Sequence, residues 1–440
     1  MQLTRHARIW HAKCSTGAQA GQGSMDLIQG RKELLMENLK NSARVLGYIK
    51  GILNYKETPG YVLLNPGPVL TTPRVKAALV HHDTCHRDTD FAVLVRNLRS
   101  KLKKVFRGDE RHEVVLITGS GTSGIEAAIS STIPEDKKIL VLINGAFGER
   151  YREVSAVHRL NMEVLDFGWC NPMDVSAVEA KLAADPEICA VMMAHHETSV
   201  GLINPIGEIG AICRRHDRLL LVDAVSSLGA EDLDVVRDNI DICLSSANKA
   251  MQAIAGVAFV CVNDRAWKVI ETVRPRVYYL DLKRYRKYAI EEELTPFTPA
   301  VNGFFALDAA VDELLEDGVE SRWELYRERN RFLREAFTSM GLTFLAETGR
   351  RSATLNIVKV PEYITFAELY NRMKGYGFII YGCKGILTDK YFQIANMGDL
   401  SEEMLQSFVN TMQFVLYRAA REAGQAVTMV EEPKVVDAVR

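Results

Sequence analysis

Two charged residues lie just beyond short apolar stretches in the middle of the chain. Asp223 ends the stretch that begins at Leu219, and Lys249 follows the stretch Ile240–Leu244. If both stretches are strands of one parallel sheet, both side chains face the crevice at its carboxyl edge. There, a lysine amine can form a Schiff base with an aldehyde, and a carboxylate can keep a pyridine nitrogen protonated. Pyridoxal 5'-phosphate (PLP) requires this pair, because its protonated ring accepts electrons from a substrate carbanion.

A glycine-rich segment, Thr118–Gly124, follows the apolar stretch Val114–Ile117. Free amides at a helix N-terminus, with the hydroxyls of Ser120 and Thr122, suit a phosphate dianion. The same glycines also fit the G-x-G-x-x-G pattern of dinucleotide-binding folds. That fold expects an acidic residue about 20 positions further on, at the end of the next strand. Here that strand ends in Ile143–Gly145, without an acid, which favours PLP over NAD but leaves NAD open.

Two further motifs stand at the ends of apolar stretches. Phe147 could stack on a planar heterocycle, although most phenylalanines belong to the core. His195–Ser199 offers hydroxyls to a cofactor, although an ordinary polar loop explains it nearly as well. Apolar residues at Ala253–Val257 follow Lys249, so we expect its amine to be desolvated and therefore a better nucleophile. Core packing does not readily explain all these motifs at successive strand ends.

The motifs belong to a repeating pattern of short apolar stretches separated by segments of helical length. The stretches are Val114–Ile117, Ile139–Ile143, Ile188–Met193, Leu219–Val222, Ile240–Leu244 and Val257–Val262. The helical segments include Gly148–Asn161, Val175–Ala184 and Gly207–His216. This pattern predicts an α/β fold with a mainly parallel sheet covered on both faces.

Composition narrows the class of protein. The chain has 440 residues, 47% hydrophobic and 25% charged, which fits one large domain and a smaller one. The formal charge of -2 disfavours nucleic acid and anionic membranes as partners. The eight cysteines form no C-x-x-C pair, which indicates reduced thiols. No apolar run approaches the roughly 18 residues of a membrane span. We therefore predict a soluble, cytoplasmic protein.

Three segments carry weaker signals. Residues 1–24 contain Arg5, Arg8 and Lys13 and no acidic residue, so organellar targeting is conceivable, but a flexible leader is favoured. The segment Lys32–Leu53 has a helical pattern. His81–Asp88 holds three histidines and a cysteine, but their spacing fits no common zinc pattern. We therefore predict a polar loop there and no metal site.

The order of these motifs resembles the class V aminotransferases of PLP fold type I. The matching motifs are Gly119–Thr122, Asn144–Phe147, His196–Ser199, Asp223–Ser227 and Ser246–Lys249. Within that class the chain is most similar to the 2-aminoethylphosphonate:pyruvate aminotransferases. The motifs closest to that group are Asn65–Pro68, Asn204–Ile206, Ser245–Lys249 and Ile380–Tyr381.

The resemblance runs from about Tyr61 to Tyr417 and implies two domains. A PLP-binding domain with a mainly parallel, seven-stranded type of sheet flanked by helices would occupy residues 61–325. A smaller α+β domain would occupy 326–423, between a leader with a helix (1–60) and a tail (424–440). The small domain would contain the strand Thr354–Val358, the helix Thr365–Lys374, the strand Phe378–Tyr381 and the helix Ser401–Arg421.

The resemblance also implies roles for residues. Lys249 would carry the Schiff base and then move a proton between substrate and cofactor. Asp223 would pair with the pyridinium nitrogen, and Phe147 would stack on the ring. The residues that hold the phosphate would be Ser120, Gly121 and Thr122. Thr198 would lie near the ring hydroxyl, and Thr298 would touch the phosphate bound to the other subunit. The last role implies a homodimer with shared sites.

One position departs from the family pattern. The family usually has an arginine at the position of Gln393, where it binds the acidic group of the substrate. Glutamine cannot make the bidentate charged contact that arginine gives to a carboxylate or phosphonate. Either another cation, namely Arg87, Lys384 or Lys390, supplies that contact, or the substrate differs.

The resemblance implies PLP-dependent transfer of an amino group from a small amine to a 2-oxo acid such as pyruvate. The expected donor is 2-aminoethylphosphonate or a related aminophosphonate. A serine or alanine:glyoxylate aminotransferase remains an alternative, as does another class V PLP enzyme such as a lyase or desulfurase. A dinucleotide-binding oxidoreductase or a catalytically silent binding protein is a more distant alternative.

Overall fold

The computed structural model describes residues 60–345 and 349–426. The chain divides into the units Met1–Thr58 and Pro59–Arg440, and the described residues belong to the second. The predicted leader (1–24) and the predicted helix Lys32–Leu53 lie outside the described residues. None of the helices in the described part of the chain is long and apolar enough to cross a membrane.

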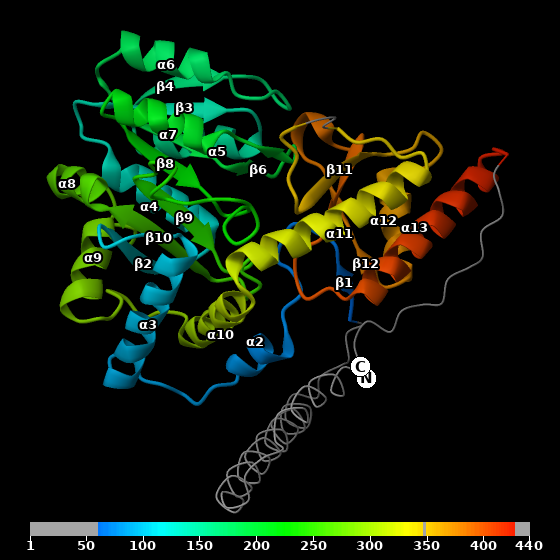
Figure 1. Cartoon of the computed structure of the whole chain (residues 1–440), viewed down its shortest axis with the longest axis horizontal. Helices are drawn as coiled ribbons and strands as arrows, with labels where there is room; N and C mark the ends of the chain where they lie inside the picture. Colours follow the sequence, from blue (N-terminus) through cyan, green and yellow to red (C-terminus); the bar gives the residue numbers. More distant parts are fainter. Residues whose placement is uncertain (1–59, 346–348, 427–440) are drawn as a thin grey trace, which may run out of the picture. The chain divides into compact units, whose positions relative to one another are not determined.

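A seven-stranded sheet with the order β2-β10-β9-β8-β5-β3-β4 forms the centre of this unit (Figure 1). Its strands are β2 (His112–Thr118), β3 (Lys138–Ile143), β4 (Asn161–Asp166), β5 (Ile188–Ala194), β8 (Leu219–Asp223), β9 (Ile242–Ser246) and β10 (Val257–Asn263). Only β10 runs antiparallel to its neighbours, β2 and β9. The predicted mainly parallel α/β sheet is confirmed.

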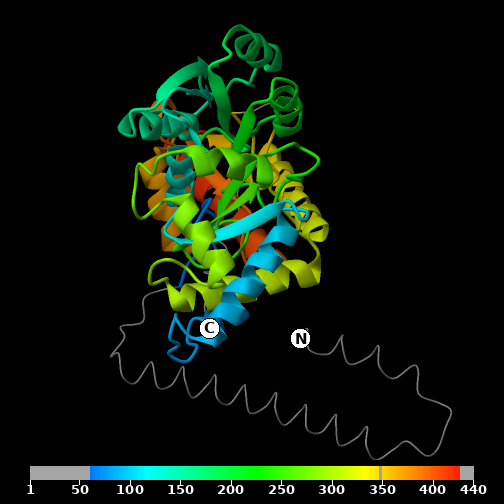
Figure 2. The same ribbon diagram turned by 90° about the vertical axis from the view of Figure 1, so that its left-hand side faces the viewer.

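Helices cover both faces of the sheet because its strands are apolar on both sides (Figures 1 and 2). Alternate residues of β2 enter different cores: Val114 and Leu116 belong to one, Val115 and Ile117 to the other. The first core is shared with α3 (Thr89–Val105), α6 (Val175–Ala184), α7 (Ile206–Arg215) and α10 (Val301–Asp317). The second is shared with α4 (Gly121–Thr132), α5 (Ala146–Val157), α8 (Asp264–Thr272) and α9 (Leu282–Glu291).

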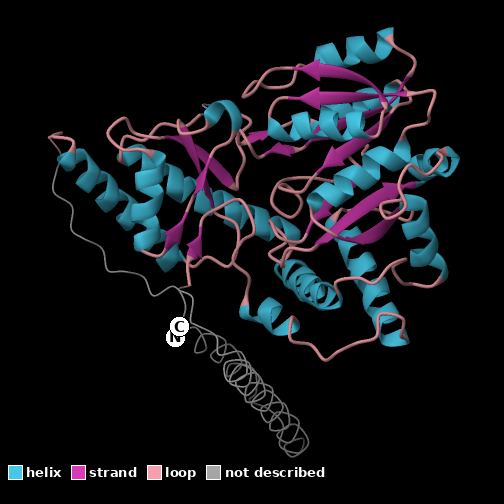
Figure 3. Cartoon of the chain, turned by 180° about the vertical axis from the view of Figure 1, so that it is seen from behind, coloured by secondary structure: helices cyan, strands magenta, loops and turns pink. Residues whose placement is uncertain are grey.

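The C-terminal part contains a smaller α+β arrangement, whose strands form a group apart from the large sheet (Figure 3). An antiparallel sheet has the order β11 (Leu355–Lys359), β14 (Tyr391–Ala395), β13 (Tyr381–Gly382). Its helices are α11 (Val319–Ser339), α12 (Phe366–Gly375) and α13 (Glu402–Glu422), with the short 3₁₀ turn η2 (Gly385–Leu387). The predicted boundary between residues 325 and 326 lies within α11.

Short elements join these parts. The strand β1 (Val62–Leu63) pairs in parallel with β12 (Phe378–Ile379), far along the chain. The helix α2 (Pro73–Ala78) starts at a capping Thr72, whose hydroxyl accepts from the Val75 amide. The strands β6 (His196–Glu197) and β7 (Leu202–Ile203) form a hairpin.

The segment His81–Asp88 lies outside the helices and strands, and the ring of His81 stacks on Phe305 with centroids 3.7 Å apart.

The strand β10, next to the edge strand β2, gives a test of the packing. Phe259 is fully buried and meets the ring of Phe106 edge-on at 5.9 Å. We expect Phe259→Ala to lower the free energy of unfolding by about 3–5 kcal/mol, because it leaves a cavity between the sheet and α3. The control Val157→Ala, at a side chain 76% exposed, should change it by less than about 0.5 kcal/mol. Denaturant midpoints measure both, and equal midpoints would contradict the packing described.

Candidate active site

The Lys249 side chain lies at the carboxyl end of β9, three residues beyond Ser246. Burial lowers the pKa of its amine to about 8, opposed by the charge of Asp223 and assisted by Arg150 and Lys384. The backbone of Gly67 packs on the lysine stem, since a Cβ there would lie 2.5 Å from Lys249 Cδ. A partly neutral amine at the edge of the sheet can act as a nucleophile or accept a proton.

Asp223 ends the neighbouring parallel strand β8, whose register pairs it with Leu244 of β9. Its carboxylate is buried and accepts hydrogen bonds from Tyr151 Oη and the Val225 amide, both at 2.8 Å. Burial raises the pKa of Asp223, while these two bonds oppose the shift. The structure therefore brings Asp223 and Lys249 to the same edge of the sheet, as the sequence predicted.

The glycine-rich loop connects β2 to α4, which begins at Gly121. Ser120 is the N-cap of this helix, but its hydroxyl makes no capping bond. A Cβ at Gly121 would lie 2.7 Å from Val225 Cγ2, so glycine lets the loop approach the residues that follow Asp223. An uncommitted hydroxyl beside the first amides of a helix can bind a phosphate.

Arg150 joins this loop to Phe147. Its Nη1 donates to Thr122 Oγ1 at 3.4 Å, and its guanidinium lies 4.8 Å from the centroid of the Phe147 ring. Its charge also acts on Asp223 and Lys249. Sequence reasoning missed Arg150 and Tyr151, although both follow Phe147 at spacings that keep them on one side of α5.

Glu197 holds the start of α5 in place. This buried carboxylate accepts from the amides of Phe147 at 3.2 Å and Gly148 at 3.2 Å, and from Ser199 Oγ at 2.6 Å. Burial raises its pKa, and the bonds from Ser199 and the amides oppose the shift. Glu197 thus positions Phe147. From the sequence alone, Glu197 was only part of a possible polar loop.

Thr198 and Gln393 are in contact. Thr198 Oγ1 donates to Ser226 Oγ at 2.6 Å, and Gln393 Nε2 donates to the Thr198 carbonyl at 3.1 Å. The buried ring of His196 lies beside them, where burial lowers its pKa to about 3. Its Nε2 has no hydrogen-bond partner in the described part of the chain. The amide of Gln393 is therefore committed to the backbone of the β6–β7 hairpin.

The remaining predicted residues make other contacts. Arg87 donates to the carbonyls of Thr295 at 3.2 Å and Pro296 at 3.4 Å. Thr298 Oγ1 lies 3.4 Å from His86 Nε2. These contacts hold residues 86–87 against 295–298. The Ala300 amide donates to Thr118 Oγ1 at 3.0 Å, so this segment lies next to the start of the glycine-rich loop. Lys384 is exposed at the start of η2, and its positive charge helps to lower the pKa of Lys249.

The residues at the two strand ends fit PLP. Glycine at position 67 lets the backbone pack against the Lys249 stem, and glycine at position 121 lets the glycine-rich loop approach the residues after Asp223. The buried carboxylate of Asp223 ends the strand beside the lysine. The helix N-terminus supplies donors for a phosphate, and buried His196 Nε2 lacks a partner within the described residues. Among those residues, no group of three or more His, Cys, Asp or Glu side chains could hold a metal ion.

Comparisons with known proteins agree with this geometry. Residues 74–368 match the family model of class V aminotransferases. An uncharacterised aminotransferase of Methanocaldococcus jannaschii is 34% identical over 367 residues, covering 83% of this chain and 95% of the relative. The 2-aminoethylphosphonate–pyruvate transaminase of Salmonella paratyphi C is 32% identical over 364 residues, covering 81% and 98%.

Solved structures give the same result. The ureidoglycine–glyoxylate aminotransferase of Bacillus subtilis superposes with a TM-score of 0.79 at 26% identity, covering 85% of this chain and 96% of that one. The pyridoxamine–pyruvate aminotransferase of Mesorhizobium loti gives 0.77 at 27% identity, covering 84% and 95%.

The chain belongs to the class V aminotransferases, and it is a PLP-dependent enzyme of fold type I. Within that family it is similar to the 2-aminoethylphosphonate–pyruvate transaminases over nearly their whole length. The expected cofactor and reaction class are confirmed.

The lowered pKa of Lys249 can be measured on the cofactor-free protein. Pulse acetylation, followed by mass spectrometry of the Lys249 peptide, should show half-maximal reactivity near pH 8, against about 10.4 for an ordinary lysine. Below that pH the amine is charged and unreactive. Asp223→Asn removes a negative charge that favours the charged amine, so the midpoint should fall further. A wild-type midpoint near pH 10 would contradict burial of the amine.

Proposed function

We propose that this enzyme transfers the amino group of a small acidic amine, 2-aminoethylphosphonate or a related aminophosphonate, to pyruvate or another 2-oxo acid. The observation that carries the proposal is the placement of Lys249 and Asp223 at the carboxyl ends of neighbouring parallel strands. The names of the relatives at about 32% identity support the choice of donor and acceptor.

In this proposal Lys249 would hold PLP through its amine and would take a proton from the substrate carbon. A pKa near 8 keeps a useful fraction of the amine neutral for that transfer. When bound, PLP supplies an aldehyde that captures the amine and a ring that accepts electrons. Asp223, oriented by Tyr151 and the Val225 amide, keeps the ring nitrogen charged.

The other cofactor contacts follow from the same placement. Phe147 would stack on the ring, and Thr198 would lie near the ring hydroxyl. The phosphate is held by Ser120, Gly121 and Thr122. We also propose a cytoplasmic homodimer, in which Thr298 touches the phosphate bound to the partner subunit, as the family resemblance implies.

Lys384 is our candidate for binding the acidic group of the donor. Gln393 has no charge, and its amide already donates to Thr198. Lys384 is exposed, and its positive charge acts on the Lys249 amine. A cation there can attract a phosphonate or carboxylate while leaving the amine of the substrate free to react.

A second candidate is a serine or alanine:glyoxylate type of transamination. The similarity to the ureidoglycine–glyoxylate aminotransferase, at 26% identity, supports it. Gln393 does not distinguish the two candidates, because serine and alanine also carry a carboxylate that an arginine would bind. The two candidates share every cofactor residue and differ only in the donor. A panel of amines, each with pyruvate or glyoxylate, distinguishes them by rate.

The role of Lys249 is tested by Lys249→Ala. We expect transamination to fall at least about 10³-fold, because the variant loses both the covalent attachment and the proton acceptor. The visible absorption of lysine-bound PLP should disappear as well. Lys76→Ala, at an exposed lysine of α2, should keep both properties. Full activity of Lys249→Ala would refute the assignment.

The role of Lys384 is tested by Lys384→Met. We expect the KM for 2-aminoethylphosphonate to rise about 10-fold, because one charged contact is lost. The KM for an uncharged amine should stay the same. Lys390→Met is the matched control, since Lys390 is exposed on the same segment and is not among the charges that act on Lys249. Equal changes of this KM in the two variants would contradict the assignment of Lys384.

A further inference from the structure

A cavity lined by arginines shares no lining residue with the group assigned to the cofactor. It has a volume of about 600 Å³ and is bordered by α11, by the start of α7 and by residues 349–353. None of the residues assigned to PLP lines it. Five arginines line the cavity against three glutamates: Arg327, Arg331, Arg334, Arg350 and Arg351 face Glu208, Glu231 and Glu335.

Two of the glutamates are already engaged. Glu208 forms an ion pair with Arg350 at 3.3 Å. Buried Glu231 accepts from Ser352 Oγ at 3.0 Å and the Ala353 amide at 2.7 Å, and burial raises its pKa to about 7. Part of the Glu231 charge is therefore lost at neutral pH. Arg327 forms an ion pair with Glu324 on the same helix. Arg331 and Arg334 form no ion pair within the described residues, so they give the cavity a positive charge.

Arg334 is the most constrained of the arginines. Its guanidinium is partly buried and donates only to neutral oxygens, Asn356 Oδ1 at 2.7 Å and the Ser352 carbonyl at 3.2 Å. Burial, and then the nearby charge of Arg351, lower the pKa of Arg334 to about 10. Two guanidinium groups in one cavity repel each other, and an anion between them would remove that cost.

Arg331 precedes Arg334 by three residues and follows Arg327 by four, so all three lie on one face of α11. Within the described residues, Arg331 makes no hydrogen bond or ion pair. Asn330 also lines the cavity and is buried, and its Nδ2 has no acceptor in the same part of the chain. The cavity thus contains charged and neutral donors that lack acceptors.

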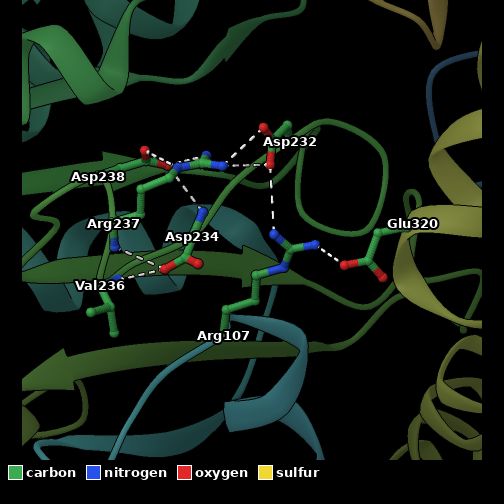
Figure 4. Close-up of polar contacts among 7 residues, drawn as sticks. All are labelled: Arg107, Asp232, Asp234, Val236, Arg237, Asp238 and Glu320. Atoms are coloured by element: carbon green, nitrogen blue, oxygen red, sulfur yellow. Dashed lines mark hydrogen bonds and ion pairs between the residues drawn. The ribbon is translucent and has the colours of Figure 1, made fainter.

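Arginines pair with acidic residues that follow Glu231 in the chain (Figure 4). Arg237 pairs with Asp232 at 3.0 Å and with Asp238 at 2.8 Å. Arg107 contacts Asp232 and also Glu320 of α11. The acidic residues next to Glu231 are therefore matched by their own arginines, so they do not cancel the charge of the cavity.

From this geometry we infer that the arginine cavity binds a small dianion, such as the phosphate group of a metabolite. Guanidinium groups pair with phosphate through two parallel N–H bonds, which a single-point cation cannot do. The ligand is distinct from the transamination substrate, because the cavity contains neither Lys249 nor any residue assigned to PLP. The enzyme therefore has a separate anion site.

Inorganic phosphate, titrated calorimetrically into the PLP-loaded full-length protein at constant ionic strength, tests this site. We expect saturable binding that leaves the visible spectrum of the cofactor unchanged. Arg331→Gln should weaken phosphate binding about 10-fold or more, because it removes a charged hydrogen-bond donor. Arg418→Gln, at an exposed arginine of α13, should bind phosphate as the wild type does.

Arg331 is exposed and makes no hydrogen bond or ion pair within the described residues, so its loss should not impair folding. Absence of saturable binding at millimolar phosphate would overturn the inference. Equal affinities in Arg331→Gln and Arg418→Gln would also overturn it, because the phosphate would then bind elsewhere. Transamination by Arg331→Gln is measured separately, so failure of this inference leaves the proposed function intact.

Discussion

The parallel pairing of β8 with β9 is the constraint on which the active site depends. Because the two strands are hydrogen-bonded side by side in the same direction, their carboxyl ends meet at one edge of the sheet. Asp223 ends one strand, and Lys249 follows the other. Burial at this edge lowers the pKa of the lysine and raises that of the aspartate, and the charge of each residue partly opposes the shift of the other.

A set of buried polar residues fixes this edge. Tyr151 donates to Asp223, and Glu197 accepts from the first amides of α5, the helix that carries Phe147 and Arg150. Such contacts cost little entropy on binding because they are already made in the folded protein. The cofactor residues are thus held by hydrogen bonds between strand ends that are distant in the chain.

The C-terminal part of the chain brings its own residues to this edge. The strand β14 carries Gln393, which donates to Thr198 of the hairpin after β5, and the segment before η2 carries Lys384. The same part contributes Arg350 and Arg351 to the arginine cavity, where they meet α11. Backbone bonds from Ile203 to Arg350, at 2.8 Å, and from Ser352 to Gly201, at 3.1 Å, join the hairpin to this segment. The positions of Gln393 and Lys384 and the shape of the arginine cavity therefore both depend on how the C-terminal part packs against the large sheet.

The amino-acid sequence by itself determined the fold class, the cofactor and the lysine–aspartate pair. Apolar strands and strand-end motifs are local signals, because each depends on residues close together in the chain. The helix Val175–Ala184 was predicted with its observed bounds. The edge strand β4 was missed because its residues are partly exposed and include Glu163 between apolar neighbours.

Only the tertiary structure decided which distant residues meet. Tyr151 and Glu197 reach the site from other elements, and Arg87 lies with Thr295 instead of beside Lys249. The arginines of the cavity come from α11 and from residues 350–351, and no short motif connects them. Their convergence follows from the packing of elements far apart in the sequence, which local propensities do not encode.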